Sequence, residues 1–97
     1  MSKLLKGLSE EFDARMALRR RMIAHLDIRL SEAATIQNRE DVRATLVGCS
    51  CCTACDDCQL WLLWRRAGTP DACVAADAFL RLQAVAEAEN RTHRRAG

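Results

Sequence analysis

The sequence predicts an all-α fold, a small bundle of four to five short helices around a four-cysteine metal or cluster site. Three observations support this prediction. Alanine, leucine and arginine dominate the composition, tyrosine is absent and Pro70 is the single proline, which favours helices over strands. Apolar residues recur at three- and four-residue steps, as they do in amphipathic helices. Five of the six cysteines lie in one short segment, from Cys49 to Cys58.

The length of 97 residues indicates a single helical domain over 1–97. A domain this short buries a limited core and is often stabilised by a metal, a disulfide or a partner. The chain is polar beyond Glu89. We therefore expect order over about 9–90, with frayed ends.

The first half of the chain is expected to form three helices. Ser9, followed by two acidic residues, is expected to cap a helix that runs to Leu26. The stripe of this helix that faces the core is expected to contain Phe12, Met16, Arg19, Met22, Ile23 and Leu26. A short second helix is expected over 28–36. Asn38 resembles the N-cap of a third helix that ends at Gly48. The apolar residues of this third helix are Val42, Leu46 and Val47.

The second half is expected to form a loop and two helices. Residues 49–55 have no helical period and predict a loop. Asp56 or Asp57 is expected to cap a fourth helix that runs to about Arg66, with Cys58 in its first turn. Thr69-Pro70-Asp71 is expected to open the last helix, because proline is well tolerated at the first helical position. The apolar stripe of this last helix contains Val74, Phe79, Leu82, Val85 and Ala86.

Charge and hydropathy narrow the classes of partner. The formal net charge of +2 is too small to indicate nucleic-acid binding, and the arginine clusters are interpreted as solvated surfaces. No signal peptide is visible, and the apolar run 60–64 is far shorter than the ~20 residues of a membrane helix. We therefore expect a cytoplasmic protein with a protein partner and no membrane contact. No catalytic set or nucleotide fingerprint indicates an enzyme, and the oligomeric state is left open.

The cysteines form the densest chemical motif of the chain. The six residues are Cys49, Cys51, Cys52, Cys55, Cys58 and Cys73. One four-thiolate pattern is C-x2-C-x2-C-x2-C, from Cys49 to Cys58. A second is Cys49-x2-Cys52-x5-Cys58-x14-Cys73. In both, two residues between ligands let the backbone wrap one metal ion or one face of a cluster without strain.

In a reducing cytoplasm, a dense cysteine pattern indicates metal binding rather than disulfides. Bacterial ferredoxins bind a four-iron cluster with three cysteines at this step and a fourth elsewhere. We therefore expect an iron–sulfur cluster of the [4Fe-4S] type, with a zinc tetrathiolate as the alternative. Copper(I) also suits soft thiolates, whereas covalent haem is not indicated, since the chain has no C-x-x-C-H run. Helix N-termini near Cys58 and Cys73 would favour the thiolate form.

From Arg15 to about Leu82 the chain resembles a family of small alphaproteobacterial proteins known only as a domain of unknown function. The matching residues are Arg21-Met22, Leu30, Cys49-x2-Cys52-x5-Cys58-x2-Trp61-Leu62, Pro70-Asp71-Ala72-Cys73, Ala76, Phe79 and Leu82. The resemblance implies four ligands, which are Cys49, Cys52, Cys58 and Cys73. It leaves Cys51 and Cys55 as additions of this chain and as alternative ligands. It implies a site but no activity.

Trp61 and Trp64 share one face of the predicted fourth helix and are expected to pack in the core or to shield the site from water. These features together predict a small cytoplasmic iron–sulfur protein that is regulatory and senses redox state, gases or iron. The alternatives are a structural zinc module for protein interaction and a small electron carrier.

Overall fold

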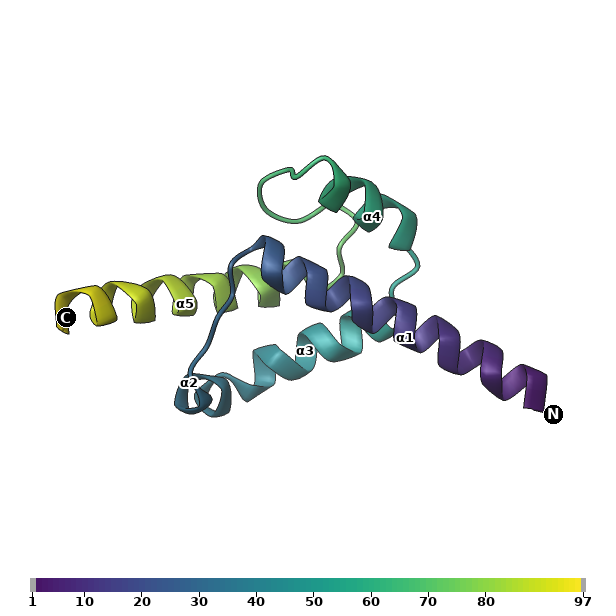
Figure 1. Cartoon of the computed structure of the whole chain (residues 1–97), viewed down its shortest axis with the longest axis horizontal. Coiled ribbons are helices and arrows are strands. Elements are labelled where there is room, and N and C mark those ends of the chain that lie inside the picture. Colours follow the sequence, from purple (N-terminus) through teal and green to yellow (C-terminus); the bar gives the residue numbers. More distant parts are fainter. Residues whose placement is uncertain (1, 97) are drawn as a thin grey trace.

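The computed structural model describes the backbone of residues 2–96 and the side chains of residues 7 and 9–92. Over this part of the chain the structure contains helices and no strand, which confirms the all-α prediction. The helices are α1 (Ser2–His25), α2 (Glu32–Gln37), α3 (Arg39–Ser50), α4 (Cys55–Leu63) and α5 (Ala76–Ala96). Both α3 and α4 pack on α1, and α5 packs on α3 (Figure 1). None of these helices is long and apolar enough to cross a membrane.

Helix α1 begins before the predicted N-cap and ends as predicted. Its first turns continue through Ser9, because leucine and lysine are good helix formers and a single glycine costs only about 1 kcal/mol. At its other end Asp27 has a φ of 54°. The Ile28 N–H donates to the Ile23 carbonyl at 3.0 Å, and the Asp27 N–H donates to the Ala24 carbonyl at 3.1 Å. These are the two hydrogen bonds of a Schellman motif, here built without glycine.

The predicted second helix starts too early. Residues 28–30 have no regular secondary structure after the Schellman turn, and Ser31 is the N-cap of α2, where its Oγ accepts the Ala34 N–H at 3.1 Å. Asn38 stands at the predicted N-cap of α3 but makes no capping hydrogen bond there. Its amide nitrogen donates instead to the Ala34 carbonyl at 2.8 Å. Asn38 is therefore the N-cap of α3 by position, while its side chain closes α2.

The predicted apolar face of α3 is correct at Val42, which packs against the core, and wrong at its other two positions. Leu46 and Val47 are exposed, whereas Thr45 is completely buried. The Thr45 hydroxyl donates to the Val42 carbonyl at 2.7 Å and accepts from Arg19 Nε at 3.0 Å. A fully hydrogen-bonded hydroxyl can be buried at little cost, and so a threonine takes the inner position.

Gly48 does not end α3, as the sequence had suggested. The helix runs on to Ser50, and Gly48 lies against the segment that precedes α5. A Cβ atom at Gly48 would stand 2.9 Å from the Cβ of Ala75. The glycine therefore allows a close approach of two chain segments, and each of these segments carries a cysteine nearby.

Both helices of the second half have bounds that differ from the predicted ones: α4 ends earlier, and α5 begins later and runs past Glu89 to Ala96. Helix α4 follows an N-cap at Ala54 and ends in a Schellman turn, with Arg65 at a φ of 51°. Asp56 and Asp57 lie inside its first turn. Their negative charges interact favourably with the helix dipole, but neither residue caps the helix. Helix α5 begins at Ala76, six residues after Pro70, because the intervening residues form turns. Val74 consequently lies outside the apolar stripe and is exposed.

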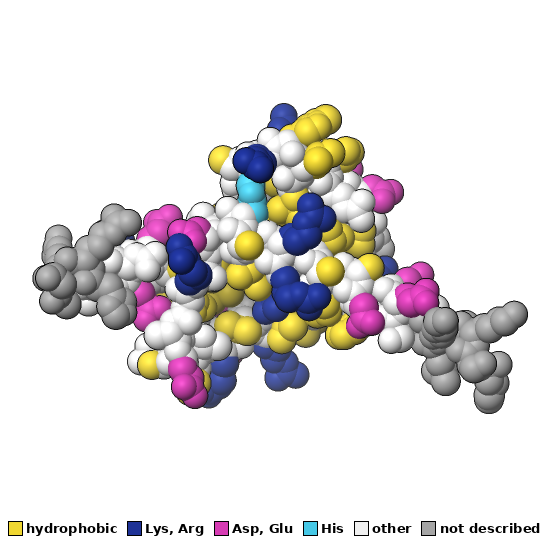
Figure 2. Space-filling model, viewed as in Figure 1, with side chains coloured by type: hydrophobic (Ala, Val, Ile, Leu, Met, Phe, Trp, Pro, Cys, Tyr) yellow, Lys and Arg dark blue, Asp and Glu magenta, His cyan; other side chains and the backbone are white. Residues whose placement is uncertain are grey.

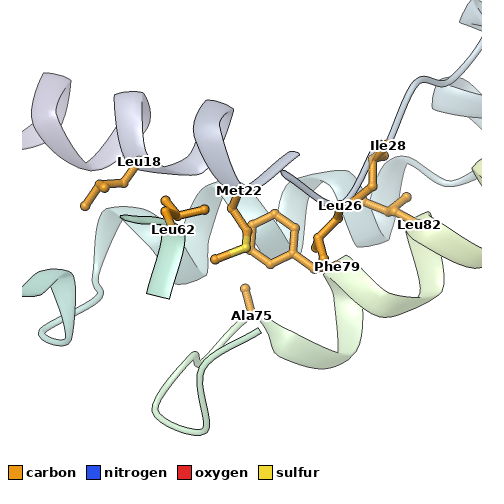
Figure 3. Close-up of a cluster of buried hydrophobic side chains, with 8 residues drawn as sticks. All are labelled: Leu18, Met22, Leu26, Ile28, Leu62, Ala75, Phe79 and Leu82. Atoms are coloured by element: carbon orange, nitrogen blue, oxygen red, sulfur yellow. The ribbon is translucent and has the colours of Figure 1, made fainter. Parts of the chain in front are cut away.

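The core joins α1, α4 and α5 (Figure 3). Met22 and Phe79 are its most buried large side chains, each 1 % exposed. The buried residues are Leu18, Met22, Leu26, Ile28, Leu62, Ala75, Phe79 and Leu82. Of the predicted α1 stripe, Phe12 is exposed, whereas Met16, Met22 and Leu26 are buried as expected.

Polar contacts fix α5 against the first half of the chain. Arg81 Nη2 lies 2.9 Å from the Asp41 carboxylate on α3. The Glu89 carboxylate accepts both the backbone N–H and the hydroxyl of Ser31, at 3.1 and 2.6 Å. Arg81 and Glu89 lie about two turns apart on α5, and they connect it to α3 and to the start of α2.

Replacement of Gly48 by alanine should destabilise the protein. The added methyl group would force α3 and the segment at Ala75 apart, at a cost of about 1–3 kcal/mol that exceeds the gain in helix propensity. Chemical denaturation measures the change. Gly7→Ala is the matched control, since Gly7 has open space around it, and it should stabilise by up to about 1 kcal/mol. Equal effects of the two substitutions would contradict the close approach.

Candidate metal centre

One cavity brings most of the cysteines together. It has a volume of about 30 Å³ and is bounded by α1, α3, α4 and residues 70–73. The cysteines that line it are Cys49, Cys52, Cys55, Cys58 and Cys73. Its apolar wall includes Leu18, Met22 and Phe79, so the core also forms one side of the cavity. Cys51 is exposed and is not among the residues that line it.

The cysteines come from four different local structures. Cys49 is in the last turn of α3, although the sequence predicts a loop there. Cys52 lies in the loop 51–54, and both Cys55 and Cys58 lie at the start of α4, close to the expected place. Cys73 precedes α5 in a turn, three residues before the helix begins, because α5 starts later than predicted.

Hydrogen bonds hold the loop that carries Cys52. Arg15 Nε on α1 donates to the Cys52 carbonyl at 3.2 Å. The Cys52 Sγ accepts the Ala54 N–H at 3.3 Å, and the Cys52 N–H donates to the Cys49 carbonyl at 3.3 Å. An arginine of α1 thus fixes the backbone of the loop, while a backbone N–H contacts the sulfur atom directly.

Arg19 is a site residue that the sequence marks only as a polar member of the α1 stripe. It lines the cysteine cavity and donates to the Thr45 hydroxyl at 3.0 Å. Burial lowers the pKa of Arg19, whereas the neighbouring Cys49 thiolate raises it. A half-buried guanidinium at the cavity therefore places a positive charge where thiolates would gather. The sequence feature that could have identified Arg19 as a site residue is its place as the one arginine on an otherwise apolar stripe.

The thiols affect one another electrostatically. Burial, followed by the charge of Cys73, raises the pKa of Cys49 to about 12. Burial, followed by the charges of Cys73 and Cys52, raises the pKa of Cys58 to about 11. Burial also raises the pKa of Cys73, against a hydrogen bond from the Ala75 N–H that lowers it. In the metal-free protein these groups are therefore neutral thiols at pH 7.

These interactions join every pair among Cys49, Cys52, Cys58 and Cys73. Cys55 interacts with Cys58. Because such interactions require short separations, the four cysteines of the second sequence pattern share one region of space. No three His, Cys, Asp or Glu side chains among the described residues are placed to hold a metal ion as they stand. The donor chemistry fits a thiolate-ligated group, but the ligand geometry would have to form on binding.

Comparison with known proteins identifies a family. A model described as a family of unknown function, DUF6455, matches residues 6–85. This chain belongs to DUF6455. No curated protein and no solved structure matches the chain. The expected membership in a family of unknown function is therefore confirmed, and the alphaproteobacterial range and the family's cysteine pattern stay predictions.

The DUF6455 match includes both tryptophans, which lie beside the cysteine cavity rather than in its wall. Both line a second groove with residues 70–72. Trp61 is half-buried, packs against the core and donates from Nε1 to the Gly68 carbonyl at 2.9 Å. Trp64 is 64 % exposed, so it does not pack in the core. Shielding of the site by Trp61 stays a prediction.

His25 has a structural contact that the sequence does not indicate. Its Nε2 is hydrogen-bonded to the Arg66 carbonyl, which can only accept, so Nε2 carries the proton. The contact joins the last turn of α1 to the turn that follows α4. His25 therefore positions α4 on α1 and is not one of the residues that line the cysteine cavity.

The raised thiol pKa values predict that the metal-free DUF6455 chain loses stability in alkali. Folded Cys49 keeps its proton up to about pH 12, whereas an unfolded cysteine releases it near 9.0. The contribution of the protonated Cys49 thiol to the free energy of unfolding is therefore complete below pH 9 and is lost as the pH rises toward 12. Thermal unfolding in a reducing buffer at increasing pH measures this loss. Cys49→Ser should make the decline shallower, whereas Cys51→Ser should not; an unchanged slope for Cys49→Ser would contradict the assignment.

Proposed function

We propose that this chain is a small cytoplasmic iron–sulfur-binding protein that acts as a regulator and senses redox state, gases or iron. Its cluster, of the [4Fe-4S] type, would be held by Cys49, Cys52, Cys58 and Cys73. The main support is the electrostatic interaction of all four thiols around one cavity. Four negative charges in one place are unfavourable, and bound iron would offset this repulsion.

The surroundings of the cavity suit an anionic thiolate-ligated group. Arg19 supplies a positive charge at the cavity, and the Ala54 and Ala75 N–H groups donate to sulfur atoms of Cys52 and Cys73. Hydrogen bonds to sulfur and nearby charge are the means by which a protein tunes an iron–sulfur potential. A fifth thiol, Cys55, also lines the cavity and is the alternative ligand.

The regulatory part of the proposal follows from where the ligands lie in the chain. Cys49 ends α3, Cys58 belongs to α4, and Cys73 precedes α5. A shared cluster would join these segments, and the thiols would move inward to reach it. Loss of the cluster would release the same segments, since metal binding and folding are coupled in small domains. The surface that a protein partner contacts would change with the state of the cluster.

A structural zinc site is the second candidate, and the size of the cavity favours it. A volume of about 30 Å³ is close to the space of one or two waters, which a single ion matches better than a cluster does. A zinc tetrathiolate would use the same four cysteines. It would hold the helices together without a sensing step.

Anaerobic purification followed by iron, sulfide and zinc analysis separates the two candidates. The proposal predicts a coloured protein with iron and acid-labile sulfide in equal amounts. Exposure to air or nitric oxide should bleach the colour and loosen the helices, which circular dichroism would detect. A colourless protein with one equivalent of zinc would overturn the iron–sulfur assignment and leave the zinc alternative.

Serine replacements test the choice of ligands. Cys49→Ser, Cys52→Ser, Cys58→Ser and Cys73→Ser should each lower the bound metal by more than about tenfold, because each removes a sulfur atom that binds the metal. Cys51→Ser is the control, since Cys51 is exposed outside the cavity, and it should keep full occupancy. Cys55→Ser should also keep it. An empty site in Cys55→Ser with a filled site in Cys73→Ser would show that the first sequence pattern provides the ligands.

A further inference from the structure

The outer face of α4 is apolar and open to solvent. Leu60, Leu63 and Trp64 are 47 %, 69 % and 64 % exposed. Figure 2 shows hydrophobic side chains gathered at the top of the molecule, where Figure 1 places α4, with basic side chains beside them. Single exposed apolar residues are ordinary, but three within five positions of one short helix form a patch of the kind that contacts partners.

This face borders a groove, which we call the α4 groove. It has a volume of about 290 Å³, far larger than the cysteine cavity, and lies between α4 and residues 70–72. Its apolar lining comes from Leu60, Trp61, Trp64, Pro70 and Ala72. The groove can therefore take a bulky apolar side chain.

The charge at the rim of the groove is positive on one side. The Arg66 guanidinium carbon lies 5.2 Å from the centroid of Trp61 and 5.9 Å from that of Trp64. These cation–π contacts hold the guanidinium beside the apolar surface. Arg65 is exposed next to it. A carboxylate beside the inserted side chain would complement both arginines.

We propose that the α4 groove binds a segment of a partner protein that inserts a bulky apolar side chain and pairs an adjacent carboxylate with Arg66. The apolar lining supplies the contact area, and the arginine fixes the orientation of the segment. Asp57 and Asp71, at other points of the lining, disfavour a second acidic group and so restrict where the carboxylate can lie.

The groove also shares its walls with the proposed cluster site, and this part of the inference rests on the proposed function. One wall is α4, which carries Cys58, and the other immediately precedes Cys73. Pro70 lines both the groove and the cysteine cavity. A cluster bound to Cys58 and Cys73 would fix both walls and lower the ordering cost of partner binding. Partner binding would strengthen cluster binding by the same factor.

Two synthetic amphipathic helices of equal length test the partner chemistry. One presents leucine and glutamate, and the other presents leucine and lysine. Trp61 and Trp64 are the only tryptophans of the chain, so their fluorescence reports directly on the groove. The glutamate peptide should bind the full-length protein at least about fivefold more tightly than the lysine peptide. Arg66→Glu should reverse this preference.

Leu60→Ser should weaken binding of the glutamate peptide by about fivefold or more, because it removes apolar contact area. Leu46→Ser is the matched control, since Leu46 is similarly exposed but lies on α3, and it should bind as the unaltered protein does. Equal binding of both peptides, no binding of either, or equal losses in the two variants would overturn the proposal. Self-association without peptide that Leu60→Ser abolishes would assign the groove to a second copy and would also overturn it.

Titrations of the metal-free and the metal-loaded protein separate this inference from the proposed function. The loaded form should bind the glutamate peptide at least about threefold more tightly. Metal analysis of the same samples tests the proposed function alone. A loaded protein that binds no peptide would overturn only the groove proposal. A protein that binds the peptide but never takes up metal would overturn the proposed function and the link between the two sites. The proposal that the α4 groove binds a partner segment would still hold.

Discussion

The packing of Met22 against Phe79 is the contact on which the rest of the structure depends. It joins α1 to α5 at the centre of the core, and both side chains are almost completely buried (Figure 3). The same two side chains form part of the wall of the cysteine cavity. The core and the candidate site therefore share side chains, and the apolar contact that stabilises the fold also positions the wall around which the thiols lie. A short chain with a limited core gains from a bound group at this point.

Two arginines of α1 adapt this core to a polar site. Arg15 holds the backbone of the Cys52 loop, and Arg19 connects the buried Thr45 hydroxyl to the cavity. The two arginines lie about one turn apart on α1, next to the buried side chains of Met16, Leu18 and Met22. The cost of half-burying Arg19 is offset by its hydrogen bond to Thr45 and by the negative charge that deprotonated thiols would supply.

The sequence predicts the helical class, the middle of each long helix and the residues that gather at the site. These features depend on periodicity and composition, which are local. It does not predict the end of α4, because Arg65 adopts the left-handed conformation that glycine usually supplies. It also does not predict the burial of Thr45, because the hydrogen bond from Arg19 that completes the pairing of its hydroxyl is tertiary. The late start of α5 likewise depends on tertiary packing: Ala75 must meet Gly48, and this contact holds Cys73 in a turn.

We propose that Cys49, Cys52, Cys58 and Cys73 together provide a single sulfur-ligated metal centre. X-ray absorption spectroscopy at the metal edge of the anaerobically purified protein tests it most directly, because it counts the ligands and identifies their element. We expect four sulfur neighbours for each metal atom and, for the cluster, iron neighbours beyond them; zinc alone would show four sulfurs at about 2.3 Å. Nitrogen or oxygen ligands, or fewer than four sulfur neighbours, would rule out a centre held by these four thiolates.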